Sequence, residues 1–331
     1  MTIRVSVVVP TYRRPQLLER CLDALRIQIF DPTEYEIIVA DDAGAAGDAE
    51  TAAIVSRLAR LQALQGPALS RVVVGDVSRA HGPAAARNAG WRAARGAIIA
   101  FTDDDCIPDP DWLRAGVAAM REGISGVSGR LLAPCAPRPT DYERNAARLQ
   151  DAEYITANCF YRRDALESVG GFDERFRVAW REDSDLAFSL LERGHRIVRN
   201  PDARVTHPIR PAPWGISLRQ QRYSMYNALL YRKHPRLYRE RIQSAPPWRY
   251  YACVAALSLG LAGLGARRPA ASVVGLGAWG ALTAQFCAMR LRGASKAPRH
   301  VAEMLFTSAA IPPLSVFWRI AGALRYGVVF L

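Results

Sequence analysis

The chain has 331 residues, of which half are hydrophobic and 23% are charged, so disordered, collagen-like and coiled-coil proteins are excluded as descriptions of the whole. The formal net charge is +13, but residues 199–249 hold eleven basic and two acidic residues and residues 250–331 hold eight and one. The first 198 residues are therefore slightly acidic, which argues against a nucleic-acid-coating protein and for a localised anionic partner.

The first hundred residues are expected to alternate between strands and helices. Continuous apolar runs predict buried strands, and apolar residues at helical spacing predict the helices between them. The expected strands are 5–10, 36–40, 71–75 and 97–101, and the expected helices follow Pro15, include 54–61 and run from Pro83 to Arg95. This alternation indicates an α/β fold with a mainly parallel, doubly wound sheet. In such sheets ligands bind beyond the carboxyl ends of the strands.

The rest of the chain changes character twice. Residues 125–210 read as mixed α/β, with a helix starting near Asp183 or Ser184 and ending at Gly194. A proline-rich join, 208–213, precedes a basic helical candidate at 216–242. These shifts predict a catalytic domain at 1–215, a basic amphipathic linker or interfacial helix at 216–249, and apolar membrane-associated helices at 250–331.

Three apolar stretches carry the membrane prediction. Residues 250–266 and 269–289 contain no charged residue, and the third stretch, 304–318, contains Pro312-Pro313. About 20 apolar residues span a bilayer, but buried helices of a soluble domain are the alternative. Basic residues lie between the stretches and Glu303 is the one acidic residue of the tail, which favours the membrane.

Three further patterns in the sequence are weak or negative. Gly275, Gly277 and Gly280 match GxGxxG, but no strand precedes them, so close helix packing explains them better than a dinucleotide site. The six cysteines show no CxxC spacing, which indicates a reducing cytosol without a disulfide frame or zinc site. The apolar run after Arg4 stops at Pro10 and is too short for a signal peptide.

Three acidic groups are candidates for chemistry. Asp41-Asp42 ends the second strand, where a carboxylate can bind a nucleotide base or ribose; a turn or helix N-cap is the alternative. Asp103-Asp104-Asp105 follows the fourth strand, where neighbouring carboxylates repel each other and a divalent cation relieves that repulsion. The alternative for this group is a solvated acidic turn.

The third acidic group is Glu182-Asp183 at the predicted helix start. The helix dipole favours an ionised carboxylate there, and such a carboxylate can accept a proton from an attacking hydroxyl. Plain helix capping by Asp183 or Ser184 is the alternative.

Four blocks of sequence together resemble the inverting family-2 glycosyltransferases of the GT-A fold, of the membrane-associated bacterial type. The blocks are VSVVVPTYRRPQLLERCLDAL, IIVADD, GPAAARNAGWRAARGAIIAFTDDDCIPDPDWL and ANCFYRRDALESVGGFDERF followed after four residues by REDSDLAFSLLERGHRI. They cover about residues 3–207 in the family's order and spacing. The resemblance implies a nucleotide-sugar donor and a Mg²⁺ or Mn²⁺ cofactor.

The resemblance also implies roles for individual residues. The nucleotide-sugar side comprises Pro10, Thr11, Tyr12, Asp41, Asp42, Arg87, Asn88, Asp103 and Asp104. Asp103 and Asp105 form the DxD motif, with Asp105 as the metal ligand and His207 as a metal or diphosphate contact or an ordinary histidine. Asp183 is the implied catalytic base, and Asn158, Trp180 and Glu182 line up with the acceptor side.

The function implied is transfer of a sugar to a lipid-linked or surface-glycan acceptor at the cytoplasmic face of the cell membrane, with no nucleic-acid partner. The processive QxxRW motif is incomplete at 219–223, which weakens a polymer-synthase reading. A nucleotidyltransferase would build a similar nucleotide–metal site, and a non-enzymatic anionic-surface binder would leave the acids structural. Both alternatives stay open from the sequence.

If residues 250–266 and 269–289 both span the membrane, Arg267-Arg268 between them lies on its outer side, against the positive-inside tendency.

Overall fold

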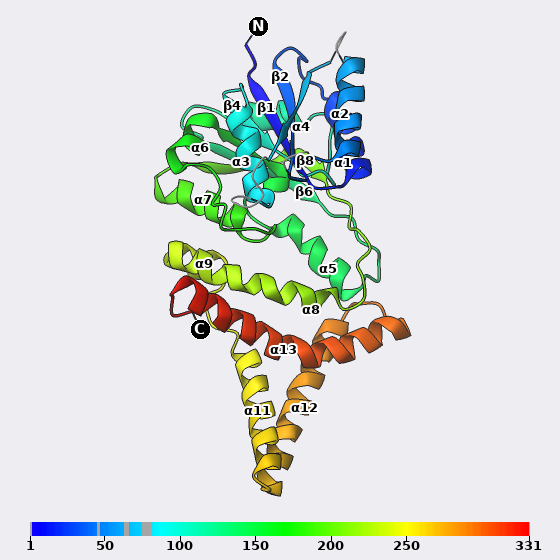
Figure 1. The fold of residues 1–331 in the computed structure, drawn as a ribbon, viewed down its shortest axis with the longest axis vertical. Coiled ribbons are helices and arrows are strands. Elements are labelled where there is room, and N and C mark those ends of the chain that lie inside the picture. The colour runs from blue at the N-terminus through cyan, green and yellow to red at the C-terminus, as the bar shows by residue number, and fades with distance from the viewer. Residues whose placement is uncertain (1, 45–46, 63–65, 75–80, 331) are drawn as a thin grey trace. The chain divides into compact units, whose positions relative to one another are not determined.

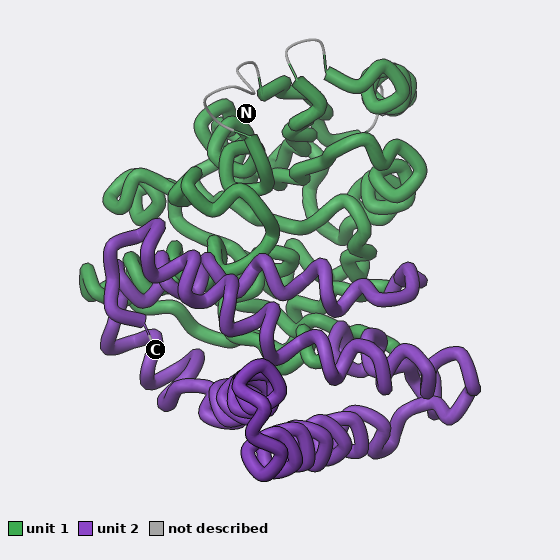
Figure 2. The backbone as a smooth tube through the Cα atoms, turned by 60° about the horizontal axis from the view of Figure 1, so that its bottom comes forward, with its two compact units in different colours: residues 1–134, 148–208 green, residues 135–147, 209–331 purple. Residues whose placement is uncertain are grey.

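The fold comes from a computed structural model, which describes residues 2–44, 47–62, 66–74 and 81–330. The chain forms two compact units, coloured separately in Figure 2. Unit 1 comprises residues 1–134 and 148–208, and unit 2 comprises residues 135–147 and 209–331. The segment 135–147 thus groups with the C-terminal helices, although it lies inside the predicted 1–215 domain. The three-part division of the sequence stays a prediction.

Unit 1 is built on a sheet whose described strands run in the order β3-β2-β1-β4-β7-β6-β8-β5. The first half is parallel and consists of β1 (Val5–Thr11), β2 (Tyr35–Asp41), β3 (Ala68–Val73) and β4 (Ile98–Phe101). Three helices connect these strands: α1 (Pro15–Arg26), α2 (Ala49–Gln62) and α3 (Pro83–Ala93). This alternation confirms the prediction for the first hundred residues. Gly75, which ends the predicted third strand, lies outside the described residues.

The second half of the sheet is mixed. It consists of β5 (Ile107–Pro108), β6 (Gly126–Leu132), β7 (Cys159–Arg162) and β8 (Ile197–Thr206). Strand β7 is antiparallel to β4 and β6, β6 is parallel to β8, and β5 is antiparallel to β8. Its helices are α4 (Trp112–Ala119), α6 (Arg163–Val169) and α7 (Glu182–Glu192), with short 3₁₀ turns at Arg148–Asp151 and Thr156–Asn158.

Alternating side chains of the strands supply two cores, one on each face of the sheet. Val7 and Val9 of β1 pack on one face in a cluster that includes Leu22 of α1. Val8, between them, points to the other face and joins Trp91 of α3 and Leu186 of α7. Because successive strand residues point to opposite faces, the unbroken apolar run of β1 requires helices on both sides.

Unit 2 is helical in its described part. Its helices are α5 (Asp141–Ala147), α8 (Ile216–Gln220), α9 (Met225–Lys233), α10 (Pro235–Arg241), α11 (Trp248–Gly265), α12 (Pro269–Leu291) and α13 (Pro298–Tyr326), with a 3₁₀ turn at Gln221–Ser224. The predicted basic helix at 216–242 is therefore broken into short segments. The apolar sides of these segments are buried, at Leu229 of α9 and Leu237 of α10 for example.

Helices α11 and α12 form a hairpin that projects from α13 (Figure 1). They approach closely at glycines, because a Cβ atom on Gly275 would lie 2.3 Å from the backbone nitrogen of Gly260. A Cβ atom on Gly277 or Gly280 would meet nothing within 4 Å, so the packing explanation of the GxGxxG pattern holds for Gly275 alone. Two helices are long and apolar enough to cross a membrane by length and composition, Pro269–Leu291 and Pro298–Tyr326.

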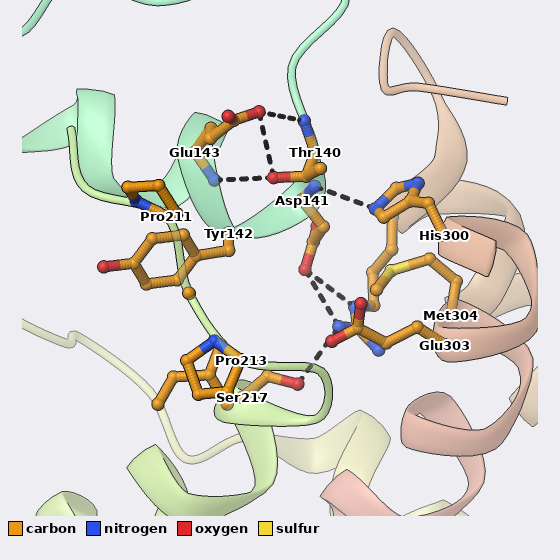
Figure 3. A pocket seen from close by; sticks show the side chains of 13 residues that line it. Thr140, Asp141, Tyr142, Glu143, Pro211, Pro213, Ser217, His300, Glu303 and Met304 are labelled. Atoms are coloured by element: carbon orange, nitrogen blue, oxygen red, sulfur yellow. Dashed lines mark hydrogen bonds and ion pairs between the residues drawn. The ribbon is translucent and has the colours of Figure 1, made fainter. Parts of the chain in front are cut away.

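A buried polar cluster lies at the root of the hairpin, beside a pocket of about 220 Å³ (Figure 3). Arg290, near the end of α12, donates two hydrogen bonds to Asp141 Oδ2, at 2.9 and 3.1 Å. It also donates to the hydroxyls of Thr307 and Ser308 in α13, at 2.6 and 3.1 Å. The imidazole Nε2 of His300 accepts a hydrogen bond from the backbone of Asp141 at 3.0 Å. Removing one partner from such a buried pair leaves an uncompensated charge, so this cluster ties α5, α12 and α13 together.

Candidate active site

The carboxyl ends of β1, β2 and β4 bring the predicted nucleotide-side residues to one edge of the sheet. Thr11 is the register partner of Asp41, and Val8 is the partner of Phe101, two residues before Asp103. Thr11 Oγ1 donates a hydrogen bond to Asp104 Oδ2 at 2.8 Å, which joins the first strand end to the acidic triplet. Parallel strands end at the same edge, and this is where ligands bind in open α/β sheets.

The two acids at the end of β2 have different surroundings. Asp41 is completely buried and accepts hydrogen bonds from the backbone of Ala43 at 3.0 Å and of Asp48 at 2.8 Å. It therefore closes the loop that follows β2. Asp42 accepts a hydrogen bond from the Gly82 backbone at 2.8 Å and lies 3.0 Å from His81 Nδ1.

Asp42 retains one oxygen for a ligand. Its Oδ1 is buried and receives no hydrogen bond from the part of the chain that the structure describes. Burial raises the pKa of this carboxyl above its usual range, against the opposing effects of Gly82 and His81. The exposed ring of Tyr12 lies edge-on to His81 at 5.5 Å and borders the same place. Asp42 and Tyr12 are thus available to a nucleoside, whereas Asp41 is occupied.

The backbone at position 82 suits only glycine. Its φ of +113° is unfavourable for a side chain, and a Cβ atom would lie 2.6 Å from the carbonyl oxygen of Arg177. The close approach lets the Gly82 N–H point at Asp42 at the start of α3.

The three carboxylates of Asp103-Asp104-Asp105 have different partners. Asp103 accepts a hydrogen bond from Arg87 at 2.8 Å. Asp104 is held by Thr11 and lies 3.3 Å from Arg14 Nη1. Burial raises the pKa of Asp104 to about 6, helped by repulsion from the two neighbouring acids and opposed by Arg14. Burial, more than repulsion between neighbouring carboxylates, therefore dominates at Asp104.

Asp105 and His207 form the pair that can hold a cation. Strand β5 pairs with β8 through Ile107 and Thr206, which brings His207 Nε2 to 3.4 Å from Asp105 Oδ1. The potential ligand atoms of Asp105, Cys106 and His207 all lie within 4.8 Å of one another. Burial raises the pKa of the Cys106 thiol well above its usual range, so it stays protonated at neutral pH and does not suit a hard cation.

The remaining donors fit Mg²⁺ or Mn²⁺. Carboxylate oxygen and imidazole nitrogen are both accepted by Mn²⁺, and Mg²⁺ needs one or two carboxylates with phosphate and water. Asp103 is not part of this cluster, because its carboxylate is paired with Arg87. The roles predicted for Asp103, Asp105 and His207 as ligands stay predictions.

The predicted base lies in the first turn of α7. Arg181, the residue before the helix, has a φ of +77° and stacks its guanidinium 4.7 Å above the ring of Trp180. Asp183 Oδ1 accepts a hydrogen bond from the Ser184 backbone at 2.6 Å. No described residue donates to the second oxygen, Oδ2, which leaves it available to an attacking hydroxyl. Burial raises the pKa of Asp183, against the hydrogen bond from Ser184 and the charge of Arg181.

Arg87 connects the two halves of the site. Its Nη1 donates to Glu182 Oε1 at 3.0 Å, and its Nη2 donates to Asp103 at 2.8 Å. The guanidinium is almost completely buried, which by itself lowers its pKa, but the two acids outweigh burial and raise the pKa. Burial and the charge of Asp183 raise the pKa of Glu182, whose Oε2 has no partner among the described residues. Arg87 thus links the acidic triplet to the start of α7.

Asn88 and Asn158 are occupied by the protein itself. Asn88 donates to the Phe172 carbonyl and to Glu174, each at 2.8 Å, and accepts from Trp91 at 2.9 Å. Asn158 is fully buried, accepts from Trp112 at 2.8 Å and donates to two backbone carbonyls. It lies against a bulge of β6, where a Cβ atom on Gly129 would come within 2.3 Å of Asn158 Oδ1. Of the predicted acceptor residues, Trp180 is the most exposed.

Sequence reasoning missed two residues of the site, Arg14 and His81, and one contact of Glu182, which it had placed on the acceptor side. Arg14, which precedes α1, reaches both Asp104 and Asp105, at 3.3 and 3.9 Å. His81 pairs with Asp42, and Glu182 forms an ion pair with Arg87. Arg14 could have been predicted from the sequence, because it is a basic residue shortly after the first strand. The contacts of His81 and Glu182 depend on tertiary structure.

Profiles of two related families match the chain. The profile described as Glycosyl transferase family 2 matches residues 6–170, and that described as Glycosyl transferase family group 2 matches residues 98–289. The two matches together contain all the site residues described above.

Two curated proteins are similar in sequence. Glycosyltransferase AglE of Haloferax volcanii is 29% identical over 231 residues, covering 66% of this chain and 70% of that protein. The pre-mycofactocin glycosyltransferase of Mycobacterium tuberculosis is 28% identical over 258 residues, covering 70% of this chain but 48% of that protein. The chain therefore spans about half the length of the second relative.

One solved structure resembles the whole chain. The mannosyltransferase PcManGT of Pyrobaculum calidifontis, in complex with GDP-Man and Mn²⁺, superposes with a TM-score of 0.56 at 23% identity. The match covers 98% of this chain and 87% of the other. With the two profiles, it bears out the predicted GT-A fold.

Proposed function

The chain belongs to the family 2 glycosyltransferases, and from that premise we propose an inverting, metal-assisted transfer from a nucleotide-sugar donor to an acceptor hydroxyl. Membership of the family makes the chain a glycosyltransferase, so the nucleotidyltransferase and the non-enzymatic binder left open by the sequence are set aside. The observation that carries the proposal is the pair of acidic sites in unit 1, Asp105 with His207 and Glu182 with Asp183, joined through Asp103 by Arg87.

The donor is held at the strand ends. Asp42 Oδ1 and the ring of Tyr12 are the groups proposed to receive the nucleoside, and Thr11 fixes Asp104 at the same edge of the sheet. Asp105 and His207 would hold a divalent cation, which would supply positive charge against the diphosphate leaving group. Arg14, which is part-exposed beside Asp104, adds positive charge on the same side. The sugar and the base of the donor are set by contacts that these residues do not define.

Asp183 is the base in this mechanism. As the acceptor oxygen forms its bond to the anomeric carbon, the bond from that carbon to the diphosphate oxygen breaks, and Asp183 Oδ2 takes the hydroxyl proton. One displacement inverts the anomeric centre and leaves no sugar on the enzyme. Glu182, clamped by Arg87, keeps the start of α7 in place, and Trp180 offers an exposed aromatic surface for the acceptor.

The acceptor in this proposal is a lipid-linked or surface-glycan hydroxyl, reached from the cytoplasmic face of the cell membrane. The support is the apolar hairpin of α11 and α12, the long α13 and the basic residues of unit 2. A membrane-held enzyme meets a lipid-linked acceptor without diffusion through the solvent, since both partners lie on the same surface.

A donor screen tests the proposal. Purified full-length protein is incubated with a panel of nucleotide sugars, with Mn²⁺, with Mg²⁺ and with excess chelator, and release of nucleoside diphosphate is measured. One donor should be hydrolysed with metal, and the chelator should abolish the activity. With an acceptor, the anomeric proton of the product should show inversion by NMR. Retention of configuration would exclude single displacement, and full activity in chelator would exclude the metal.

The variant Asp105→Ala sharpens the metal assignment. It should lose nearly all activity and weaken Mn²⁺ binding, measured by the loss of the free-ion EPR signal. Its melting temperature should change little, because removing one of three repelling acids costs little stability. Asp111→Ala, at an exposed carboxylate before α4, is the matched control and should retain both activity and Mn²⁺ binding. Unchanged Mn²⁺ binding in Asp105→Ala would remove this residue from the cation site.

A further inference from the structure

Helix α13 buries polar side chains beside apolar ones such as Met304 and Ile311, and it exposes large apolar side chains that a helix of a water-soluble domain would bury. The side chains that it buries within unit 2 include Thr307, Ser308 and Arg319. Large apolar side chains point outward instead and remain exposed: Leu305, Phe306, Phe317, Ile320 and Leu324. Leu324 is 79% exposed and Leu305 is 60% exposed, near opposite ends of the helix. The outward row runs the length of α13, and we call it the apolar row of α13.

The buried side of α13 is fixed by specific contacts, so the helix cannot turn its apolar row inward. A Cβ atom on Gly322 would lie 2.7 Å from the carbonyl oxygen of Met225, which shows how closely α13 approaches α9. Thr307 and Ser308 accept hydrogen bonds from Arg290 at the root of the hairpin. Arg319 packs its guanidinium 3.7 Å above the ring of Phe330 and donates to Gln243 at 3.3 Å.

A lipid bilayer is the occupant that fits the apolar row. The row adjoins the hairpin, whose outer surface exposes apolar side chains such as Leu261 and Val273. Basic residues flank these surfaces at Arg249, Arg292 and Lys296, while Glu303 is the one acid after residue 249. Exposed apolar area bordered by positive charge matches the hydrocarbon and the anionic head groups of a membrane. A protein partner would leave the basic border unexplained.

The composition of α13 allows it to cross the membrane, but its contacts favour an in-plane position. The charged residues of the helix are Arg299, Glu303, Arg319 and Arg325. If α13 spanned the membrane, Arg319 would lie in the hydrocarbon. Pro312-Pro313 removes two N–H donors from its middle. The backbone carbonyls that lose their helical hydrogen bonds can accept hydrogen bonds from water at the membrane surface, whereas hydrocarbon offers no donors. In Figure 1, α13 runs across the root of the hairpin rather than alongside it.

We propose that α13 lies in the plane of the membrane with its apolar row in one leaflet, while the α11–α12 hairpin enters the hydrocarbon. The inference rests on the membrane attachment proposed above and adds which surface meets the lipid. The polar cluster of Arg290 and Asp141 then lies at head-group level, where the hairpin emerges. The 18 residues of α11 extend about 27 Å, close to the roughly 30 Å of hydrocarbon, so Arg267-Arg268 at the tip reaches the opposite head groups.

Depth measurements on spin-labelled protein test this arrangement. Cys135 is the one exposed native thiol, so Cys135→Ser provides the background for single cysteines at Leu305, Phe317 and Leu324. Glu240→Cys, on the exposed side of α10, is the matched control. Each full-length variant is labelled with a nitroxide and placed in vesicles of phosphatidylcholine and phosphatidylglycerol. EPR then compares relaxation by oxygen, which enters lipid, with relaxation by a water-soluble nickel chelate.

An in-plane helix predicts that the three labels on α13 report the same shallow depth, with oxygen dominant, while the control reports water. Positions 305 and 324 are about 28 Å apart along the helix axis, so a spanning helix would give clearly different depths for 305, 317 and 324. Such a gradient would overturn the proposal, and so would nickel access at all three positions. Neither result would touch the proposed sugar transfer, because donor hydrolysis is measured separately on the same variants.

Discussion

The two units place charge and apolar surface in opposite ways. In unit 1 apolar strands such as β1 are buried on both faces, and carboxylates gather at the strand ends, where Asp104 and Asp105 meet Thr11, Arg14 and His207. In unit 2 the hairpin and α13 expose apolar side chains, and the buried interior contains Arg290 and Asp141. Unit 1 buries its apolar residues as a domain surrounded by water does, whereas the hairpin and α13 of unit 2 expose the apolar surface that the proposed membrane attachment would cover.

The same physical rule explains both units. A buried ion pair is tolerated only where its remaining donors and acceptors are satisfied. Arg290 meets this condition through Asp141, Thr307 and Ser308, so its cluster is structural. Glu182 does not, because its Oε2 has no described partner, and Asp42 Oδ1 is in the same position. The cluster of Arg290 is therefore a structural joint, whereas the oxygens of Glu182 and Asp42 that lack a partner among the described residues mark a site for a ligand.

The largest effect should come from the base. Asp183→Asn keeps the shape and the hydrogen bond from Ser184 but cannot take a proton, so transfer should slow by about 10²–10⁴-fold. Donor affinity, measured by calorimetry, should stay nearly constant because the residue faces the acceptor. Asp164→Asn is the matched control, since Asp164 caps the start of α6 in the same way at 2.7 Å. A normal rate, or a loss due mainly to donor affinity, would remove Asp183 from this role.

The second largest effect should come from Arg87, whose replacement should show how much the stability of unit 1 depends on the ion pairs with Asp103 and Glu182. Arg87→Gln leaves Asp103 and Glu182 without their cation, which should lower the free energy of unfolding by about 3–5 kcal/mol at neutral pH. The loss should shrink in acid, because an unpaired buried carboxyl has a raised pKa and is destabilising only when ionised. Arg92→Gln on the same helix, at an exposed pair, should cost less than about 1 kcal/mol. Equal losses measured by denaturant titration would contradict the bridging role.

The pH profile should report the coupled acids of α7. Burial raises the pKa of Asp183, and burial with the charge of Asp183 raises the pKa of Glu182 to about 7. A base must be ionised, so kcat/KM should fall as the pH drops from neutral, at a higher pH than an ordinary aspartate would give. Glu182→Gln removes one of two interacting acids, and the acidic limb should move to lower pH. An unshifted limb in this variant would show that the two carboxyls titrate independently.

The smallest effect should distinguish two glycines of the hairpin in unit 2. A methyl group on Gly275 would collide with the backbone of Gly260, whereas a methyl group on Gly277 would meet open space. Gly275→Ala should therefore lower the melting temperature in detergent, and Gly277→Ala should leave it unchanged or raise it, since alanine is favoured over glycine in a helix by about 1 kcal/mol. Equal behaviour of the two variants would mean that the hairpin does not pack through Gly275.

The local elements of this protein could be predicted from its sequence because their signals are local. Apolar runs ending in Asp41-Asp42 and Asp103-Asp104-Asp105 specify buried strands with acids at their ends, and the start of α7 is marked by Glu182-Asp183. The uncharged stretches of the tail likewise specify long apolar helices. In each case residues that are close in the chain determine the outcome, through the twofold period of a strand or the 3.6-residue period of a helix.

The tertiary structure alone decided which of these residues act together. Pairing of β5 with β8 brings His207 to Asp105. Arg87 of α3 meets two acids, Asp103 after β4 and Glu182 at the start of α7. The tertiary structure also fixes Asp41 in a loop and leaves Asp42 Oδ1 without a partner among the described residues. In α13 it buries Thr307, Ser308 and Arg319 and exposes large apolar side chains. A contact between distant residues depends on strand order and helix rotation, which are set by the packing of the whole chain. The sequence therefore identifies the acids and the apolar helices, and the fold determines their partners and their surroundings.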